Sequence, residues 1–359
     1  KELKMNYNYN ELFNIFQFHF NWNLARVSFL TSFVISFLQC STVNLRRVAL
    51  RMKSQNVDSN YRRIQNFFQK YGLRQQEYSL FLKSLLPKDT KYWLAIDRTN
   101  WKFGKTNINI LMIVVIYKEI AFPLCWEALE KFGNSSSSER IALLEKAVKI
   151  LGKGSIEGII GDREFIGVKW FRYLMKEEIG FHIRVKSNTK VGSKTKENNK
   201  EVKDLIKYFK VNIPKELPNR HDIFGYRLHV SGMKTKDDYC IVISNKDNTE
   251  ALKIYRQRWS IENMFGAFKT RGFHFEDTHL HHLYKIEKLI FLISIAYVWS
   301  IFTSLWLDSK VKIRVNKYGR KTISYFRRGL DYLINMLHQI LSGKMHNDYI
   351  EVIKLLSCT

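Results

Sequence analysis

Three carboxylates in the sequence lie in settings where they could take part in chemistry. Asp97 ends the apolar run "YWLAID" and Asp162 ends the run "SIEGIIGD", and an Arg follows each of them. Glu262 is the one acid in the basic stretch "YRQRWSIENMFGAFKTRGF", which begins at Tyr255. The end of a strand is a place where a rigid sheet can present a side chain to a ligand. Taken singly, each acid also has an ordinary explanation, since turns favour Asp and Glu262 could pair with Arg258 one helical turn earlier.

A joint explanation accounts for all three acids at once. Three carboxylates that meet in one cleft repel one another and need cations. Oxygen-only ligands suit Mg²⁺, or Mn²⁺ in its place. Two such ions about 4 Å apart can stabilise the attacking and leaving oxygens of an in-line phosphoryl displacement. Asp97, Asp162 and Glu262 are therefore our candidates for a catalytic site that binds two metal ions.

Basic residues around Glu262 would complete such a site. On a helix with 3.6 residues per turn, four residues of the stretch fall within about 60° of arc and so share one face: Tyr255, Arg258, Glu262 and Lys269. Arg binds phosphate by paired hydrogen bonds and Lys binds it as a point charge. We therefore expect the bases of this face to grip DNA while the acid holds metal. Trp259 lies off the face, and we expect it to pack against the sheet.

The composition makes a polyanion the expected partner. The chain has 359 residues, a formal net charge of +26 and a pI of about 9.8. Residues 43–88 carry ten Lys and Arg against two acids, and residues 310–328 carry eight and no acid. Several basic clusters interleaved with aromatic residues favour nucleic acid, and an anionic membrane surface is the second candidate. The four cysteines have no metal-ligand or redox spacing, which indicates reduced thiols in a cytosolic protein.

Two uncharged stretches raise the question of a membrane segment. Residues 27–45 and 289–307 each run for 19 residues without a charge, which is close to the ~20 residues that span a bilayer. The first has polar residues in nearly every turn, whereas the second is more apolar. We expect both to be buried core helices, and a membrane segment at 289–307 is the alternative.

The spacing of apolar residues changes along the chain and predicts its organisation. Residues 1–88 show helical spacing and predict an all-helical N-terminal region. From residue 91 onward the order strand, strand, strand, helix, strand, helix, strand predicts an α/β fold with a mixed sheet. Ser136 and Glu139 predict a capping box before the first of these helices. The polar stretch 186–201 predicts a loop, and the short strands "YRLHVSG" and "YCIVISN" follow it.

At this point the sequence resembles a known family. Asp97, Asp162 and Glu262 look like the DDE triad of bacterial insertion-sequence transposases. The spacing in "Y-xx-R-xxx-E-xxxxxx-K", from Tyr255 to Lys269, resembles the YREK signature of the insertion-sequence-four family. "AIDRTNW" and "GDREF" are similar to the segments around its two aspartates, and "GFHFEDTHL" is similar to the stretch that follows the signature. "SYFRRGLDYL" resembles a common C-terminal motif of the family. The resemblance covers roughly residues 90–335.

The resemblance implies a fold, a reaction and partners. The fold would be a ribonuclease-H-like catalytic core at 89–307, with a β-rich insertion at 186–250. A helical region at 1–88 would precede it, and a basic helical region at 308–359 would follow. The reaction would be Mg²⁺-dependent cleavage of double-stranded DNA at transposon ends, followed by strand transfer into target DNA. The enzyme would act as a homodimer in a synaptic complex, in the bacterial cytoplasm on the nucleoid and not at a membrane.

By the same resemblance, the site residues take specific roles. Asp97, Asp162 and Glu262 would hold the metal ions. Tyr255, Arg258 and Lys269 would contact DNA phosphates near the cleaved end.

Several alternatives stay open. The better-studied relatives excise through a DNA hairpin and stack a flipped base on a Trp of the insertion, but residues 186–253 contain no Trp. Either Phe224, Tyr226 or Tyr239 replaces it, or the hairpin step differs. A structure-selective nuclease on the same fold and a non-catalytic DNA-binding protein derived from a transposase are the alternative functions. The N-terminal helices could bind DNA or serve only in packing, and the Lys at position 1 leaves open whether the N-terminus is complete.

Overall fold

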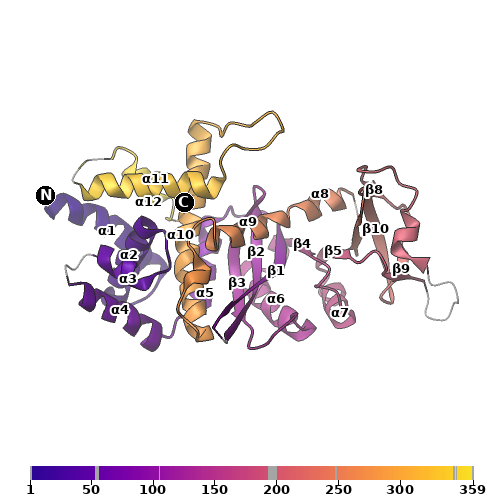
Figure 1. Ribbon diagram of the computed structural model, residues 1–359, viewed down its shortest axis with the longest axis horizontal. Coiled ribbons are helices and arrows are strands. Elements are labelled where there is room, and N and C mark those ends of the chain that lie inside the picture. Colours follow the sequence, from indigo (N-terminus) through magenta and orange to yellow (C-terminus); the bar gives the residue numbers. More distant parts are fainter. Residues whose placement is uncertain are drawn as a thin grey trace. The chain divides into compact units, whose positions relative to one another are not determined.

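The computed structural model describes residues 2–52, 56–104, 106–192, 200–246, 249–342, 344 and 346–357. Contacts within the chain divide it into two compact units (Figure 1). The helical unit comprises Lys1–Pro87, Trp101–Ile108 and Phe265–Thr359, and the sheet unit comprises Lys88–Asn100 and Asn109–Met264. Residues 193–199 of the loop predicted at 186–201, and Cys358, lie outside the described residues.

Most of the helical unit consists of α-helices, joined by short turns. Three of them begin at an Asn whose side-chain oxygen accepts a hydrogen bond from a backbone N–H of the first turn: Asn23, Asn44 and Asn56. The helices are α1 (Glu2–His19), α2 (Leu24–Cys40), α3 (Leu45–Arg51), α4 (Val57–Lys70), α5 (Gln75–Leu85), α10 (Leu283–Lys310), α11 (Tyr325–Leu341) and α12 (Tyr349–Lys354), with the 3-10 turn η3 (Phe275–Asp277). The predicted all-helical N-terminal region is confirmed.

Helix α10 forms the centre of this unit. It is long and apolar enough to cross a membrane, but 83% of its most apolar window is buried inside the protein. It packs against α11, α2 and α4. Helices α2 and α3 pass the same test only as a pair, and the chain bends by 108° between them. The expected core helix at 289–307 is therefore present, whereas the stretch 27–45 is not one continuous helix.

The sheet unit is built around one mixed sheet. In the described residues its strand order is β3-β2-β1-β4-β5-β11-β10-β8, and β9 also pairs with β10. The strands are β1 (Tyr92–Phe103), β2 (Thr106–Tyr117), β3 (Ile120–Ala128), β4 (Ile156–Gly161), β5 (Gly180–Val185), β8 (Lys215–Glu216), β9 (His221–Ile223), β10 (Tyr226–Lys234) and β11 (Tyr239–Ser244). Helices α6 (Ser137–Leu151) and α7 (Val168–Lys176) pack on it beside β3 and β5. The predicted α/β class and the order of the first seven elements are confirmed.

A close approach between three strands fixes how β1, β4 and β5 align. β4 pairs in parallel with β1 and with β5, so Trp93, Gly158 and Gly180 stand next to one another across the sheet. A Cβ atom at position 158 would collide with the indole ring of Trp93 and with the backbone of Gly180. Glycine is therefore required at the centre of this triple.

Strand β1 is longer than the sequence predicted. The prediction ended the strand at Asp97, but β1 continues to Phe103. The reason lies in residues 98–103, where buried Thr99 and Trp101 alternate with exposed Asn100 and Lys102. This alternation is the pattern of a half-buried strand, so Asp97 lies within β1. The capping box of Ser136 and Glu139 is present at the start of α6.

The segment 186–250 joins the main sheet. The predicted strand "YRLHVSG" is the larger part of β10, and "YCIVISN" contains the whole of β11, which pairs antiparallel with β5. The stretch predicted as a loop contains the two-residue strands β6 (Lys190–Val191) and β7 (Lys200–Glu201), which pair with each other. The 3-10 turn η2 (Val202–Leu205) follows them, and η1 (Lys153–Ser155) precedes β4. Strands β8, β10 and β11 of the insertion therefore extend the main sheet, whereas β6 and β7 form a small two-stranded sheet of their own.

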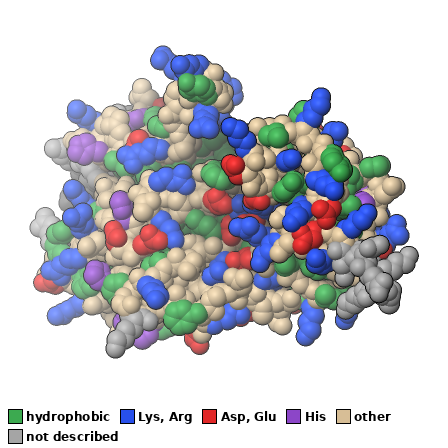
Figure 2. Space-filling model, turned by 45° about the vertical axis from the view of Figure 1, so that its right-hand side comes forward, with side chains coloured by type: hydrophobic (Ala, Val, Ile, Leu, Met, Phe, Trp, Pro, Cys, Tyr) green, Lys and Arg blue, Asp and Glu red, His purple; other side chains and the backbone are tan. Residues whose placement is uncertain are grey.

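The surface carries the expected excess of positive charge. Lys and Arg side chains are spread over the face in Figure 2, and Asp and Glu gather in small groups among them. Cys40, Cys125 and Cys240 are free thiols, as predicted.

Candidate active site

The two candidate aspartates lie side by side because of the parallel pairing of β1 with β4. Ile96 pairs with Gly161, and Asp97 and Asp162 each follow one residue later. In both, the Oδ1 atom accepts a hydrogen bond from the next backbone N–H: from Arg98 at 2.7 Å and from Arg163 at 2.8 Å. Two neighbouring strands thus present carboxylates in the same local geometry.

The helical stretch that carries Glu262 is interrupted. Helix α8 (Ala251–Arg256) ends before Gln257, and α9 (Trp259–Phe268) begins after Arg258. Backbone N–H groups across the break bond three residues back, as from Arg258 to Tyr255 at 2.9 Å and from Ile261 to Arg258 at 3.0 Å. The expected single helical face from Tyr255 to Lys269 is therefore wrong, because a tighter 3-10-like turn changes the angular spacing at residues 257–258.

Tyr255 and Arg258 connect the three carboxylates. The hydroxyl of Tyr255 donates to Oδ1 of Asp162 at 3.3 Å, and Nε of Arg258 donates to that hydroxyl at 3.2 Å. The guanidinium of Arg258 also donates from Nη1 to Oδ2 of Asp97 at 3.1 Å and from Nη2 to Oε1 of Glu262 at 2.6 Å. Asp97, Asp162 and Glu262 thus belong to one hydrogen-bonded cluster, which we call the acid cluster together with Tyr255 and Arg258.

Burial strengthens the charge–charge interactions within the acid cluster and shifts the pKa values of its groups. The Arg258 side chain is 10% exposed. Burial raises the pKa of the Asp97 carboxyl to about 6, against the opposing effects of the Arg98 N–H and Arg258. Burial alone would lower the pKa of the Arg258 guanidinium, but the charges and hydrogen bonds around it raise it. Burial likewise raises the pKa of the Tyr255 hydroxyl. Arg258 is therefore a permanent cation, and Tyr255 donates as a neutral phenol.

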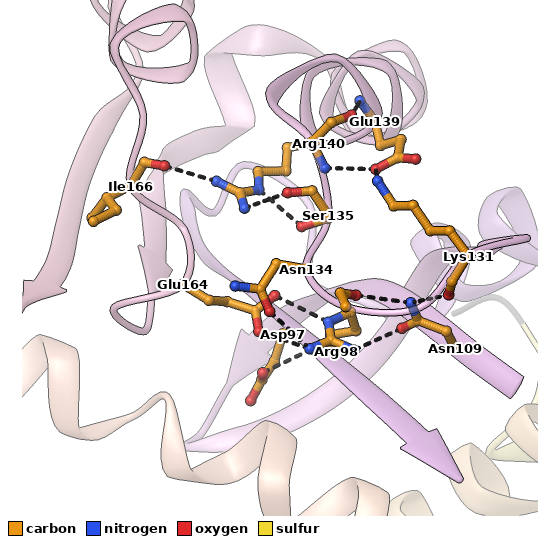
Figure 3. Close-up of polar contacts among 12 residues, drawn as sticks. Asp97, Arg98, Asn109, Lys131, Asn134, Ser135, Glu139, Arg140, Glu164 and Ile166 are labelled. Carbon is orange, nitrogen blue, oxygen red and sulfur yellow. Dashed lines mark hydrogen bonds and ion pairs between the residues drawn. The ribbon is translucent and has the colours of Figure 1, made fainter. Parts of the chain in front are cut away.

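A second network, shown in Figure 3, holds the two aspartate segments together. Arg98 follows Asp97, and its guanidinium donates to both carboxylate oxygens of Glu164, from Nε and from Nη2, each at 3.2 Å. Glu164 lies two residues after Asp162. Both side chains are largely buried. Such a two-point contact fixes orientation as well as distance, so β1 is linked directly to the segment that follows β4.

The same arginine also fixes the loop between β3 and α6. Arg98 Nη1 donates to Oδ1 of Asn109 at 2.9 Å, and Nη2 donates to Oδ1 of Asn134 at 3.2 Å. Asn109 in turn donates to the backbone carbonyls of Lys131 and Gly133 at 3.0 and 3.1 Å. Buried polar groups that are satisfied in this way make a rigid network. The loop is therefore held next to the acid cluster.

Arg140 of α6 connects this loop to the segment that follows Asp162. It donates from Nη2 to the Ser135 carbonyl at 2.6 Å and from Nη1 to the Ile166 carbonyl at 3.1 Å (Figure 3). Neither Arg140 nor the pair of Arg98 and Glu164 was among the residues predicted from the sequence. The available signal was the repeated Asp-Arg pair in "AIDR" and "GDRE", which becomes informative only once the parallel pairing is known.

The donor chemistry of the acid cluster suits a hard divalent cation, because all three acids offer oxygen ligands. The arrangement in this structure does not suit one. No three His, Cys, Asp or Glu side chains among the described residues are placed so that they could hold a metal ion together. The guanidinium of Arg258 is the cation that contacts Asp97 and Glu262 here.

Two further residues of the signature stretch have surroundings of their own. Lys269 lies past the end of α9, within the helical unit, where its Nζ pairs with Oε1 of Glu276 at 2.7 Å and lies 5.3 Å from the centre of the Trp101 ring. Trp259 is 62% exposed. The expectation that Trp259 packs against the sheet is therefore wrong, because its position on the first turn of α9 points it to solvent.

Comparison with known proteins decides the family. The model of the family described as transposase DDE domain matches residues 88–299. The chain belongs to this transposase family. A comparison with curated proteins gives no match. The matched segment runs from before β1 to beyond α9, and it therefore contains all of the acid cluster.

Family membership establishes the general activity. DDE transposases cleave DNA by phosphoryl transfer and generally use divalent metal ions, and DNA is the partner of this transposase. The mixed sheet with the order β3-β2-β1-β4-β5 and its packed helices agree with the ribonuclease-H-like core of such enzymes.

Proposed function

We propose that this transposase cleaves DNA at the ends of its element and transfers the strands into target DNA by a cut-and-paste reaction. We further propose that it is of the insertion-sequence-four type, with Tyr255, Arg258, Glu262 and Lys269 as its YREK signature. One observation carries this proposal: carboxylates from β1, from the end of β4 and from α9 meet through Tyr255 and Arg258. A simple ion pair between Glu262 and Arg258 gives no reason for two aspartates to join the same cluster.

In this proposal Asp97, Asp162 and Glu262 are the catalytic acids and the ligands of two Mg²⁺ ions, which Mn²⁺ can replace. When bound, such ions neutralise charge on the phosphate that reacts. The residues of the chain must then do two things. The parallel pairing of β1 with β4 and the contact of Arg98 with Glu164 keep the two aspartates aligned. Arg258 would then release at least one carboxylate partner, because it pairs with Asp97 and Glu262, two of the three acids that would hold the ions.

The DNA contacts follow from the same groups. Arg258 would bind a phosphate once it has released a carboxylate. The hydroxyl of Tyr255 would donate a hydrogen bond to a phosphate oxygen in place of Asp162. Lys269 would supply a point charge near the end of the DNA. Burial makes an unpaired guanidinium costly, so Arg258 would need a phosphate in place of any carboxylate that it releases.

The remaining assignments are also part of the proposal. The helices of residues 1–88 bind DNA, the catalytic core spans 89–307 with the insertion at 186–250, and the basic region 308–359 completes the chain. Two copies act together in a synaptic complex on bacterial DNA, and hence in the cytoplasm on the nucleoid. Without a Trp in the insertion, a flipped base would stack on Phe224, Tyr226 or Tyr239 if excision uses a DNA hairpin.

The test compares Glu262→Gln with Glu145→Gln, a control that removes the same charge from an exposed position on α6. The substrate is a duplex that carries the inverted repeats flanking the coding sequence. We expect Glu262→Gln to abolish Mg²⁺-dependent cleavage, since an amide is a poorer ligand for a hard cation. Its DNA affinity should stay equal or rise slightly, and the control should cleave normally.

Three outcomes would contradict the proposal. Cleavage by Glu262→Gln at the wild-type rate would reduce Glu262 to an ion-pair partner of Arg258. Cleavage of branched DNA without dependence on the element ends would favour a structure-selective nuclease. Tight binding with no cleavage by the wild-type protein would favour a non-catalytic DNA-binding protein.

A further inference from the structure

A strongly basic hairpin connects α10 to α11, and the acid cluster does not use it. Residues 311–324 fold back on themselves, with Val315 bridged antiparallel to Lys321. The N–H of Asn316 donates to the Arg320 carbonyl at 2.8 Å, and the N–H of Thr322 donates to the Arg314 carbonyl at 2.9 Å. Figure 1 shows this segment extending away from the two helices it joins. We call residues 311–324 the basic hairpin.

The base of the hairpin is firmly fixed to the helices. Asp308 near the end of α10 is buried and accepts hydrogen bonds from the Ile313 N–H at 2.8 Å and the Tyr325 hydroxyl at 3.2 Å. Arg328 of α11 lies 3.5 Å from the same carboxylate and donates to the Val311 carbonyl at 2.8 Å. The tip turns through Gly319, whose φ of +74° suits glycine. The hairpin is thus an ordered arm on a rigid base.

Its two faces differ in chemistry. In an antiparallel pair, opposite residues share a face and successive residues alternate. The pairs Arg314 with Thr322 and Asn316 with Arg320 therefore lie on one face. Ile313, Val315 and Lys321 lie on the other, where Ile313 is buried and the Lys321 ammonium lies 4.0 Å from the centre of the Tyr325 ring. The first face is polar, basic and exposed.

Exposed arginines on such an arm call for an anionic partner. The stretch 310–328 has eight Lys and Arg and no acid. Asp308, just before it, pairs with Lys312 and Arg328 but not with Arg314 or Arg320. In the described part of the chain, neither Arg314 nor Arg320 has a hydrogen-bond or ion-pair partner for its side chain. The forked guanidinium matches two phosphate oxygens.

We propose that the basic hairpin is a DNA-binding arm, and that Arg314 and Arg320 contact backbone phosphates of duplex DNA. A two-stranded ribbon fits the major groove of B-DNA, where phosphates line both edges. Such contacts set position and affinity without reading sequence. An anionic membrane would instead select an arm with apolar residues at its tip, whereas residues 316–320 are Asn, Lys, Tyr, Gly and Arg. The inference rests on DNA as the partner of the family and not on the cleavage reaction proposed above.

The test measures binding of a short labelled duplex of arbitrary sequence, by fluorescence anisotropy in chelator, over a series of salt concentrations. The variant is Arg314→Gln with Arg320→Gln. The control is Lys310→Gln with Lys321→Gln, which removes two charges from the same region. Both control ammonium groups already lie over rings of the protein, Trp306 at 3.7 Å and Tyr325 at 4.0 Å.

We expect the arginine variant to bind about tenfold more weakly or worse. Its slope of log affinity against log salt should be smaller by about 1.8, since each phosphate that an arginine neutralises adds about 0.9 to that slope. The control should keep a slope close to that of the wild type. Arg314→Lys with Arg320→Lys should restore the slope and only part of the affinity, since Lys lacks the fork.

Equal losses of affinity in the arginine variant and the control would overturn the proposal, because the hairpin would then act only through its overall charge. Unchanged binding by the arginine variant would also overturn it, as would weaker binding to anionic lipid vesicles with unchanged binding to DNA. Because the assay contains no divalent metal, loss of cleavage in Glu262→Gln and loss of binding here are separate results.

Discussion

Nη1 of Arg258 lies 3.1 Å from Oδ2 of Asp97, although the two residues are 161 positions apart in the sequence. The same guanidinium pairs with Glu262 at 2.6 Å. One side chain therefore supplies the positive charge that carboxylates from two separate elements require. The stability of the acid cluster depends on this one cation in the absence of metal.

Replacement of Arg258 by Met should make stability depend on divalent metal. It leaves Asp97 and Glu262 without their shared partner, and loss of one partner of a buried ion pair costs about 3–5 kcal/mol. We expect the free energy of unfolding in chelator to fall by about this amount, and Mg²⁺ to restore part of it in the variant more than in the wild type. Arg256→Met is the matched control, since Arg256 is exposed. An equal effect of Mg²⁺ on both variants would contradict the prediction.

The pH dependence of stability should report the burial of Asp97. Its pKa is raised to about 6 in the folded protein from an ordinary value of 3.8, so the folded state holds the proton more tightly than the unfolded state. Its contribution to stability is therefore complete below about pH 4 and is lost as pH rises through 6, by about 3 kcal/mol. Asp97→Asn removes this loss. The difference in unfolding free energy, Asn variant minus wild type, should rise from pH 4 to pH 7 in chelator; a flat difference would contradict it.

The contact between Arg98 and Glu164 should be worth more than two separate residues. A double-mutant cycle with Arg98→Met and Glu164→Gln should give a coupling energy of about 1.5–3 kcal/mol in urea unfolding, the range of hydrogen bonds to charged groups. Arg98→Met alone should also lower the rate of DNA cleavage at saturating DNA more than it lowers DNA affinity, since it loosens the alignment of the aspartates. Additive effects in the cycle would show that the two side chains act independently.

Lys269 should affect DNA binding more than cleavage. Lys269→Ala removes the contact with Glu276 and the one with the Trp101 ring, and it should weaken binding to element ends by about 1 kcal/mol. Cleavage of the bound DNA should persist. Glu276→Gln removes the same ion pair but keeps the base, so its DNA affinity should be equal to or above that of the wild type. If both variants bind DNA equally well, Lys269 has only a structural role.

Much of the acid cluster could be predicted from the sequence because local signals mark it. Apolar runs that end in Asp identified β1 and β4, and one acid among bases identified Glu262. The contacts of Arg258 could not be predicted in the same way. A basic residue beside an acid on a helix normally pairs along the helix, and only the fold brings Asp97 within reach. The tight turn at residues 257–258 also lacks a Gly or Pro that would have indicated a break in the helix.

The extent of β1 and the role of Arg98 were missed for a related reason. In the sequence, a charged residue at the end of an apolar run indicates the end of a strand. In the structure, Asp97 and Arg98 stay within the strand because residues of β2, of the segment after β4 and of α8–α9 form hydrogen bonds with them. Such tertiary contacts compensate for the burial of charge. These contacts depend on which strands are neighbours in the sheet. The sequence predicts the strands in chain order but not their order in the sheet.

Gly158, at the centre of the close approach between β1, β4 and β5, affects whether the chain folds with these strands in the correct register. Trp93 precedes Asp97 by four residues and Gly158 precedes Asp162 by four, and Trp93 pairs with Gly158. The Trp93 ring fits only beside a residue without a side chain, so the pairing of Trp93 with Gly158 sets the register that places Asp97 beside Asp162. A slip of β1 against β4 by one residue would turn Asp97 to the opposite face, and it would also place the indole against a residue larger than glycine. The misaligned chain is thus penalised during folding, so a folded molecule is also one in which Asp97 and Asp162 are in register.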